Sequence, residues 1–157
     1  MTSIDKILVP VDFQSDPKTV LQLAVELGRA HNARLVFLHV IDQPIIDAIH
    51  QVSHKGYKGE FVQGMRKLVQ DKERDLENLI PETYREGLDV ELLVRKGDPA
   101  EKIIQVAKDL SIKLIVLGSS ALEGETAFHI GEVARRVMSG APCSLLLARP
   151  TEDIGAL

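Results

Sequence analysis

The run Ile7-Leu8-Val9-Pro10-Val11, which ends at Asp12, is the stretch from which the fold of this chain follows. It is short, rich in branched side chains and uninterrupted by polar residues, which is typical of a strand covered on both faces. Similar apolar runs occupy residues 34–41, 90–94, 114–117 and 144–148. The sequence therefore predicts five buried strands.

Amphipathic segments separate these runs. Apolar residues at helical spacing predict helices at 17–31, 61–80, 99–110 and 130–138. Asp16-Pro17 and Asp98-Pro99 predict two helix starts, because Asp caps the first turn and Pro fits the first helical position. Residues 42–60 show no sustained period and are expected to form a loop with one helical turn. The alternation predicts one α/β domain over residues 1–150, a mostly parallel sheet with helices on both faces, and a tail at 151–157.

The composition excludes several classes of function. The chain has 157 residues, of which 45% are apolar and 4% aromatic with no Trp, so it lacks a surface for stacking nucleic-acid bases. The net charge of −4 predicts no polyanionic partner. No apolar run approaches the roughly 18–20 residues of a membrane span. With one cysteine and no signal-like N-terminus, the expected location is the cytoplasm, without membrane or nucleic-acid partners.

A ligand is expected beyond the carboxyl ends of the strands, where open parallel sheets usually bind one. The richest candidate is the loop that begins at Gly118, because small residues let a backbone approach a ligand and helix starts attract anions. The chain has no G-x-x-x-x-G-K-[ST] motif and no G-x-G-x-x-G motif after the first strand. It is therefore neither a Walker-A protein nor a standard dinucleotide-binding protein.

Four segments resemble the universal stress protein family: 6–12 (Lys-Ile-Leu-Val-Pro-Val-Asp), 38–40 (Leu-His-Val), 97–99 (Gly-Asp-Pro) and 141–147 (Ala-Pro-Cys-Ser-Leu-Leu-Leu). The resemblance covers about the whole chain. It implies a Rossmann-like sheet of order 3-2-1-4-5. It also implies a homodimer paired through the fifth strand, whose apolar edge is an aggregation hazard if left open.

The ATP-binding members of that family carry G-x2-G-x9-G-[ST] after the fourth strand. Aligned with this sequence, the four defined positions of the motif fall on Gly118, Ala121, Gly131 and Glu132. The two glycines match the motif, and the other two residues do not. Glu132 replaces a hydroxyl that would donate to phosphate, and an ionised carboxylate only accepts hydrogen bonds. The negative charge of Glu132 also complements the start of a helix, which is a structural reason for its presence.

The resemblance further implies adenine and ribose contacts by Asp12, Val40 and Leu117, with backbone groups near Pro10, Val11 and Val133. The predicted nucleotide-binding residues are Pro10, Val11, Asp12, Val40, Leu117, Gly118, Ser120, Ala121, Gly131, Glu132 and Val133.

Three functions remain open on the sequence. The leading one is a non-catalytic stress-response or regulatory dimer with an altered nucleotide site and an unknown protein partner. The alternative is an ATP-binding switch with at most slow hydrolysis, in which ATP is held with Mg²⁺. A true hydrolase would need a general base or a metal site, and the sequence offers no convincing one.

Other polar residues have simpler readings. A possible zinc site consists of Asp47, His50 and His54, because their spacings of three and four would bring them to one face of a helix. A solvated polar loop is the better interpretation of this segment. The segment 42–60 is also a candidate lid over the end of the second strand. His39 is expected to be a hydrogen-bonded core residue, and Ser119-Ser120 lacks the glycine spacing of a nucleophile elbow.

Overall fold

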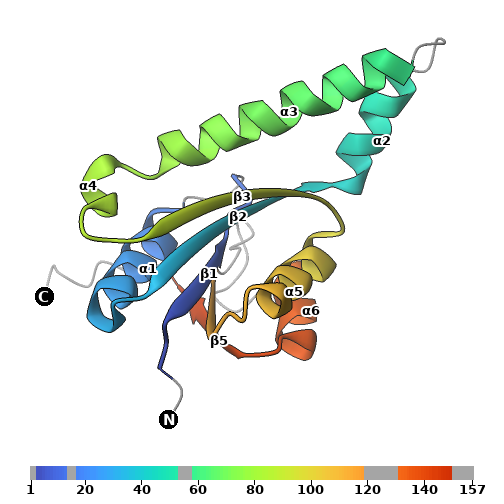
Figure 1. Ribbon diagram of the computed structural model, residues 1–157. Helices are drawn as coiled ribbons and strands as arrows, with labels where there is room; N and C mark the ends of the chain where they lie inside the picture. Colours follow the sequence, from blue (N-terminus) through green and yellow to red (C-terminus); the bar gives the residue numbers. More distant parts are fainter. Residues whose placement is uncertain (1–2, 14–16, 53–57, 119–130, 150–157) are drawn as a thin grey trace, which may run out of the picture.

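The fold is a five-stranded parallel sheet between two layers of helices (Figure 1). The computed structural model describes residues 3–13, 17–52, 58–118 and 131–149. The strands are β1 (Lys6–Pro10), β2 (Arg34–Asp42), β3 (Val90–Gly97), β4 (Leu114–Gly118) and β5 (Ser144–Ala148). Their order is β3-β2-β1-β4-β5, so the predicted topology is confirmed.

Each face of the sheet is covered by its own pair of helices. Helices α1 (Lys18–His31) and α3 (Lys58–Leu79) pack on one face, and α5 (Pro99–Asp109) and α6 (Glu132–Gly140) pack on the other. Alternate residues of each strand enter the two resulting cores, because successive side chains point to opposite faces. Ile7 and Phe37 belong to the first core, while Leu8 and Ile115 belong to the second.

The predicted loop over residues 42–60 is wrong, because most of it is helical. Helix α2 (Gln43–Val52) follows β2 directly and forms a hairpin with α3 that extends past the sheet (Figure 1). Pro44 lies in the first turn of α2, where a missing amide hydrogen costs nothing, so it starts the helix rather than breaking it. The side chain of Ile49 reaches the backbone of α3 at Gly64, where an added Cβ would lie 3.2 Å from it.

The other predicted helix boundaries agree with the structure to within three residues, and the largest difference is the start of α3 at Lys58 rather than residue 61. The side chain of Asp98 caps α5 as expected, with its Oδ2 accepting a hydrogen bond of 2.9 Å from the amide of Glu101. Asp16, the predicted cap of α1, lies outside the described residues. The short helix α4 (Glu82–Arg85) was not predicted, and its four residues are too few to show a period.

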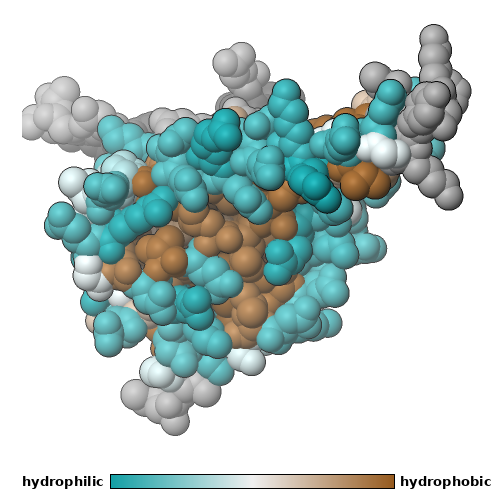
Figure 2. All heavy atoms as spheres, turned by 45° about the horizontal axis from the view of Figure 1, so that its top comes forward, coloured by the Kyte–Doolittle hydropathy of each residue, from teal (hydrophilic) through white to brown (hydrophobic). Residues whose placement is uncertain are grey.

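Hydrophobic residues also reach the surface. On the face drawn in Figure 2 they gather in the centre, surrounded by hydrophilic residues, and again near the free end of the α2–α3 hairpin. Val62 of this hairpin is 52% exposed.

In the described part of the chain, no helix combines the length and the apolar character needed to cross a membrane.

Candidate functional site

A cavity of about 390 Å³ opens beyond the carboxyl ends of β1 and β4, between the first turns of α1 and α6. Strands of a parallel sheet end at the same edge, which brings together segments far apart in the sequence. The predicted nucleotide residues that line this cavity are Pro10, Val11, Asp12, Leu117, Gly118, Gly131, Glu132 and Val133.

Three predicted residues remain, of which the structure describes Val40. Val40, in β2, is half-buried against the core under α5 and is not part of the lining. Ser120 and Ala121 lie outside the described residues. The sequence analysis missed Pro17, Val20 and Leu21 at the start of α1, although α1 is the first element after β1 and its position was the available signal. Ile103 and Ala134 complete the apolar wall.

Gly118 is required by the packing of α1 against the end of β4. A Cβ at this position would lie 2.9 Å from Cγ2 of Val20, closer than real side chains tolerate. The glycine of the nucleotide motif therefore also has a structural role here, independent of any ligand.

Residue Val11, at the end of β1, is fixed by hydrogen bonds from both of its backbone groups. Its amide donates to the carbonyl oxygen of Leu38 at 2.8 Å, and its carbonyl oxygen lies 2.7 Å from Nδ1 of His39. His39 is 7% exposed, and its ring packs at a tilt of 56° against that of Phe13, with ring centroids 4.7 Å apart. Phe13 has a φ of 63°, a left-handed conformation unusual for a bulky residue. The predicted core role of His39 is confirmed, and this core contact also holds the backbone on either side of Asp12.

His39 gives the stability of the protein a pH dependence. Burial lowers the pKa of His39, the Val11 carbonyl raises it, and the charge of Lys72 lowers it while those of Asp12 and Asp75 raise it. With a folded pKa below the unfolded value of 6.5, the unfolded state binds more protons as the pH falls through 6.5. We expect the free energy of unfolding to drop by up to about 1.4 kcal/mol per pH unit there.

Urea titrations between pH 8 and pH 5 measure this slope. His39→Gln should flatten the curve, whereas His31→Gln, at an exposed position on α1, should leave it unchanged. An unchanged slope in His39→Gln would show that another group carries the pH dependence.

The first turn of α6 points its backbone amides towards the cavity edge formed by Gly131, Glu132 and Val133. Gly131 is the N-cap residue and provides no side-chain hydrogen bond to these amides. Glu132 is the first residue of the helix, and its side chain is exposed. The site thus combines helix-start amides, which attract an anion, with a carboxylate that repels one.

An ion pair connects α6 to the start of α5. Nη1 and Nη2 of Arg136 donate to the two carboxylate oxygens of Asp98 at 2.9 and 2.8 Å. This hydrogen bond, together with the Glu101 amide, lowers the pKa of Asp98, and Asp98 in turn raises the pKa of Arg136. Because Arg136 is engaged by Asp98, its positive charge is only partly available to offset Glu132.

The residues weighed as zinc ligands have other contacts. Asp47 accepts a hydrogen bond of 2.9 Å from Nε2 of Gln43, and the His50 ring meets the Phe61 ring edge-on at 5.1 Å. His54 is outside the described residues. Among those that are described, no three His, Cys, Asp or Glu side chains are placed to hold a metal ion.

Comparisons with known proteins agree on one family. The sequence model described as the universal stress protein family matches residues 3–149. The chain is 27% identical to universal stress protein YxiE of Bacillus subtilis, over 92% of this chain and 99% of the relative.

Solved structures show the same fold. Hypothetical protein MJ0577 superposes with a TM-score of 0.76 at 22% identity, covering 96% of this chain and 99% of its own. A universal stress protein in complex with cAMP has a TM-score of 0.59 at 16% identity, with coverages of 96% and 100%. The Archaeoglobus fulgidus universal stress protein in complex with dAMP has a TM-score of 0.59 at 18% identity, with coverages of 94% and 99%.

Proposed function

Since the chain belongs to the universal stress protein family, we propose that it is a non-catalytic regulatory dimer with an altered adenine-nucleotide site in the cavity beyond β1 and β4. The observation that carries this proposal is the convergence of eight predicted nucleotide residues on one cavity. Two universal stress proteins of the same fold have been solved in complex with a nucleotide, one with cAMP and the other with dAMP. These complexes support an adenine nucleotide as the ligand.

The cavity has the chemistry of a nucleoside site. Apolar side chains of α1, β4 and α5 form walls suited to a flat base, and Asp12 can accept hydrogen bonds from ribose hydroxyls. The amides of the first turn of α6 are the natural partners of a phosphate group. Glu132 stands beside these amides, so a ligand with few phosphate charges fits better than ATP.

The charges around the cavity favour binding over catalysis. Enzymes that transfer phosphoryl groups stabilise the developing negative charge with cations. In the described part of the chain, the ionisable side chains lining the cavity are the carboxylates of Asp12 and Glu132. The sequence at 119–130 contains neither Lys nor Arg. These residues position a nucleotide without providing the cation that would promote its hydrolysis.

Calorimetric titration of nucleotide-free protein with cAMP, AMP and ATP, with and without Mg²⁺, tests this function. We expect cAMP and AMP to bind more tightly than ATP, with no phosphate released over hours. Absence of heat and of thermal stabilisation with all three nucleotides would contradict the nucleotide site. Phosphate release that is lost in a cavity variant such as Asp12→Asn would instead favour the ATP-binding switch with slow hydrolysis.

The dimer in this proposal forms through β5. This strand is at the edge of the sheet, pairs among the described strands only with β4, and carries the uncharged sequence Ser-Leu-Leu-Leu-Ala. The opposite edge strand, β3, carries Glu91, Arg95 and Lys96, and charges on an edge oppose association. Half-buried leucines at 145–147 would become fully buried across a two-fold axis.

Light scattering after gel filtration at micromolar concentration measures the mass of the particle. We expect twice the chain mass for the wild type, and the monomer mass for Leu146→Lys, because a charge at the paired edge must be desolvated. A Val62→Lys variant, with the same new charge on the exposed α3 surface, should remain dimeric. A monomeric wild type would refute the β5 interface.

A further inference from the structure

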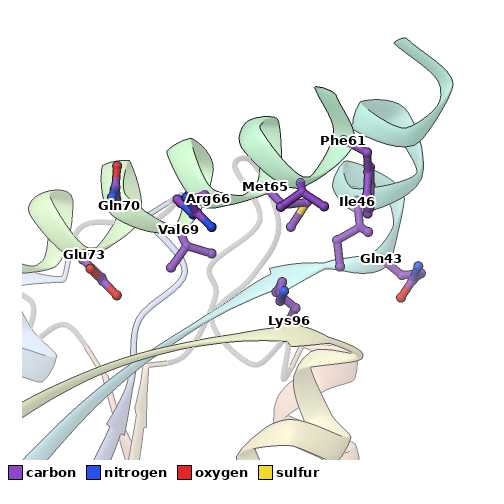
Figure 3. Close-up of a pocket in the computed structure, with 10 residues that line it drawn as sticks. Gln43, Ile46, Phe61, Met65, Arg66, Val69, Gln70, Glu73 and Lys96 are labelled. Atoms are coloured by element: carbon purple, nitrogen blue, oxygen red, sulfur yellow. The ribbon is translucent and has the colours of Figure 1, made fainter. Parts of the chain in front are cut away.

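A second cavity, larger than the nucleotide cavity and separate from it, lies under the α2–α3 hairpin. Its volume is about 710 Å³, within the range of small-molecule sites. Figure 3 shows Met65 and Val69 pointing from α3 towards β3, with Ile46 and Phe61 between α2 and α3. Its rim includes Val62, which is 52% exposed. The hairpin therefore presents an apolar surface that the rest of the described chain leaves open.

Two positive charges, those of Lys96 and Arg66, face this apolar surface. Lys96 points up from β3 towards α3, and Arg66 lies on α3 between Met65 and Val69 (Figure 3). The positions three and four residues from Arg66 hold only Val and Gln, so the helix offers it no carboxylate. Among the residues that the structure describes, neither cation has a carboxylate within ion-pair distance, whereas Arg34 has two and Lys72 and Arg136 have one each.

The balance of charge limits the ligand to a single negative charge. Glu73 lines the same cavity seven residues along α3 from Arg66, which corresponds to about 10 Å of helix. A monoanion placed between Arg66 and Lys96 avoids this carboxylate, while a multiply charged phosphate would approach it. The apolar walls near Phe61 and Val62 lie at the other end, where they suit a hydrocarbon chain or ring.

From this arrangement, we infer that the cavity under the hairpin binds a small amphipathic monocarboxylate, with the carboxylate at Arg66 and Lys96 and the apolar part against Phe61, Val62 and Met65. Carboxylates accept charge-assisted hydrogen bonds from both cations, and Arg66 offers the planar fork that suits a carboxylate. The net charge of −4 on the whole chain disfavours an anionic membrane as the occupant. This ligand site is independent of the nucleotide cavity and of its function.

Calorimetric titration of the full-length protein with decanoate, octanoate and 1-octanol tests the inference. We expect decanoate to bind about tenfold more tightly than octanoate, because two additional methylenes leave water. Octanoate should bind more tightly than octanol, which has the same chain length without the charge. No detectable binding of decanoate at millimolar concentration would overturn the inference, as would equal affinities for octanoate and octanol. Binding only to vesicles of anionic lipid would also overturn it, in favour of a membrane-docking surface.

Two pairs of exposed variants locate the ligand on the hairpin. Arg66→Gln should weaken decanoate about tenfold and leave octanol unchanged, while Arg74→Gln, on the same helix but away from the cavity, should have no effect. Val62→Asp should abolish decanoate binding by placing a carboxylate in the apolar wall. Gln63→Asp adds the same charge one residue along, outside the lining, and should retain binding. Equal effects within either pair would place decanoate elsewhere and refute the site.

Discussion

Replacing Glu132 with Ser is expected to raise the affinity for ATP by roughly tenfold to a hundredfold. Two unit charges at 4 Å repel by about 4 kcal/mol at an effective dielectric constant of 20, and by about 1 kcal/mol in bulk water. The Glu132 side chain is exposed, so the relevant value lies between these limits. The serine also restores a hydroxyl that can donate to a phosphate oxygen. The measurement is the calorimetric dissociation constant for ATP with Mg²⁺.

Two control variants separate the possible causes of this gain. Glu132→Gln removes the charge without adding a hydroxyl, so it should recover most of the gain if repulsion is the obstacle. Glu101→Ser makes the same substitution in the first turn of α5, which does not line the nucleotide cavity, and should leave ATP affinity unchanged. If neither substitution of Glu132 improves binding, the obstacle is not the charge at this position.

Replacing Phe37 with Ala is expected to reduce the free energy of unfolding by about 3–5 kcal/mol. Phe37 is in β2, is 0% exposed, and belongs to the core between the sheet and helices α1 and α3. Its removal takes the largest fully buried side chain of the described residues from the interior and leaves a cavity that rigid neighbouring strands cannot fill. Because typical domains are stable by only about 5–15 kcal/mol, this one substitution brings the protein near its unfolding threshold.

Urea denaturation followed by circular dichroism measures the loss. Val62→Ala deletes apolar atoms from a side chain that is already 52% exposed, and should change stability by less than about 0.5 kcal/mol. A small effect at Phe37 would mean that the strands on either side of β2 move together to close the cavity.

The five strands could be predicted because each contains a short, mainly apolar run, and burial of the central strands on both faces leaves no polar alternation to confuse the pattern there. The cap at Asp98 could be predicted because a cap is a local interaction over three residues. Helix α2 could not, because Ile49 is stabilised by packing against α3, which begins only after residues 53–57. Without that partner, Pro44 and a short apolar stretch indicate a loop.

The sequence by itself determined the five strands and four of the six helices that the structure describes, because local periodicity is a property of the chain alone. Through the family resemblance, it also pointed to segments that line the cavity beyond β1 and β4. Only the tertiary structure decided that Val40 lies away from that cavity and that the α2–α3 hairpin covers a second cavity. It also showed that Val20 leaves no room for a side chain at Gly118. These features depend on contacts between side chains distant in sequence. Such contacts are set by how the elements pack, and no local pattern records them.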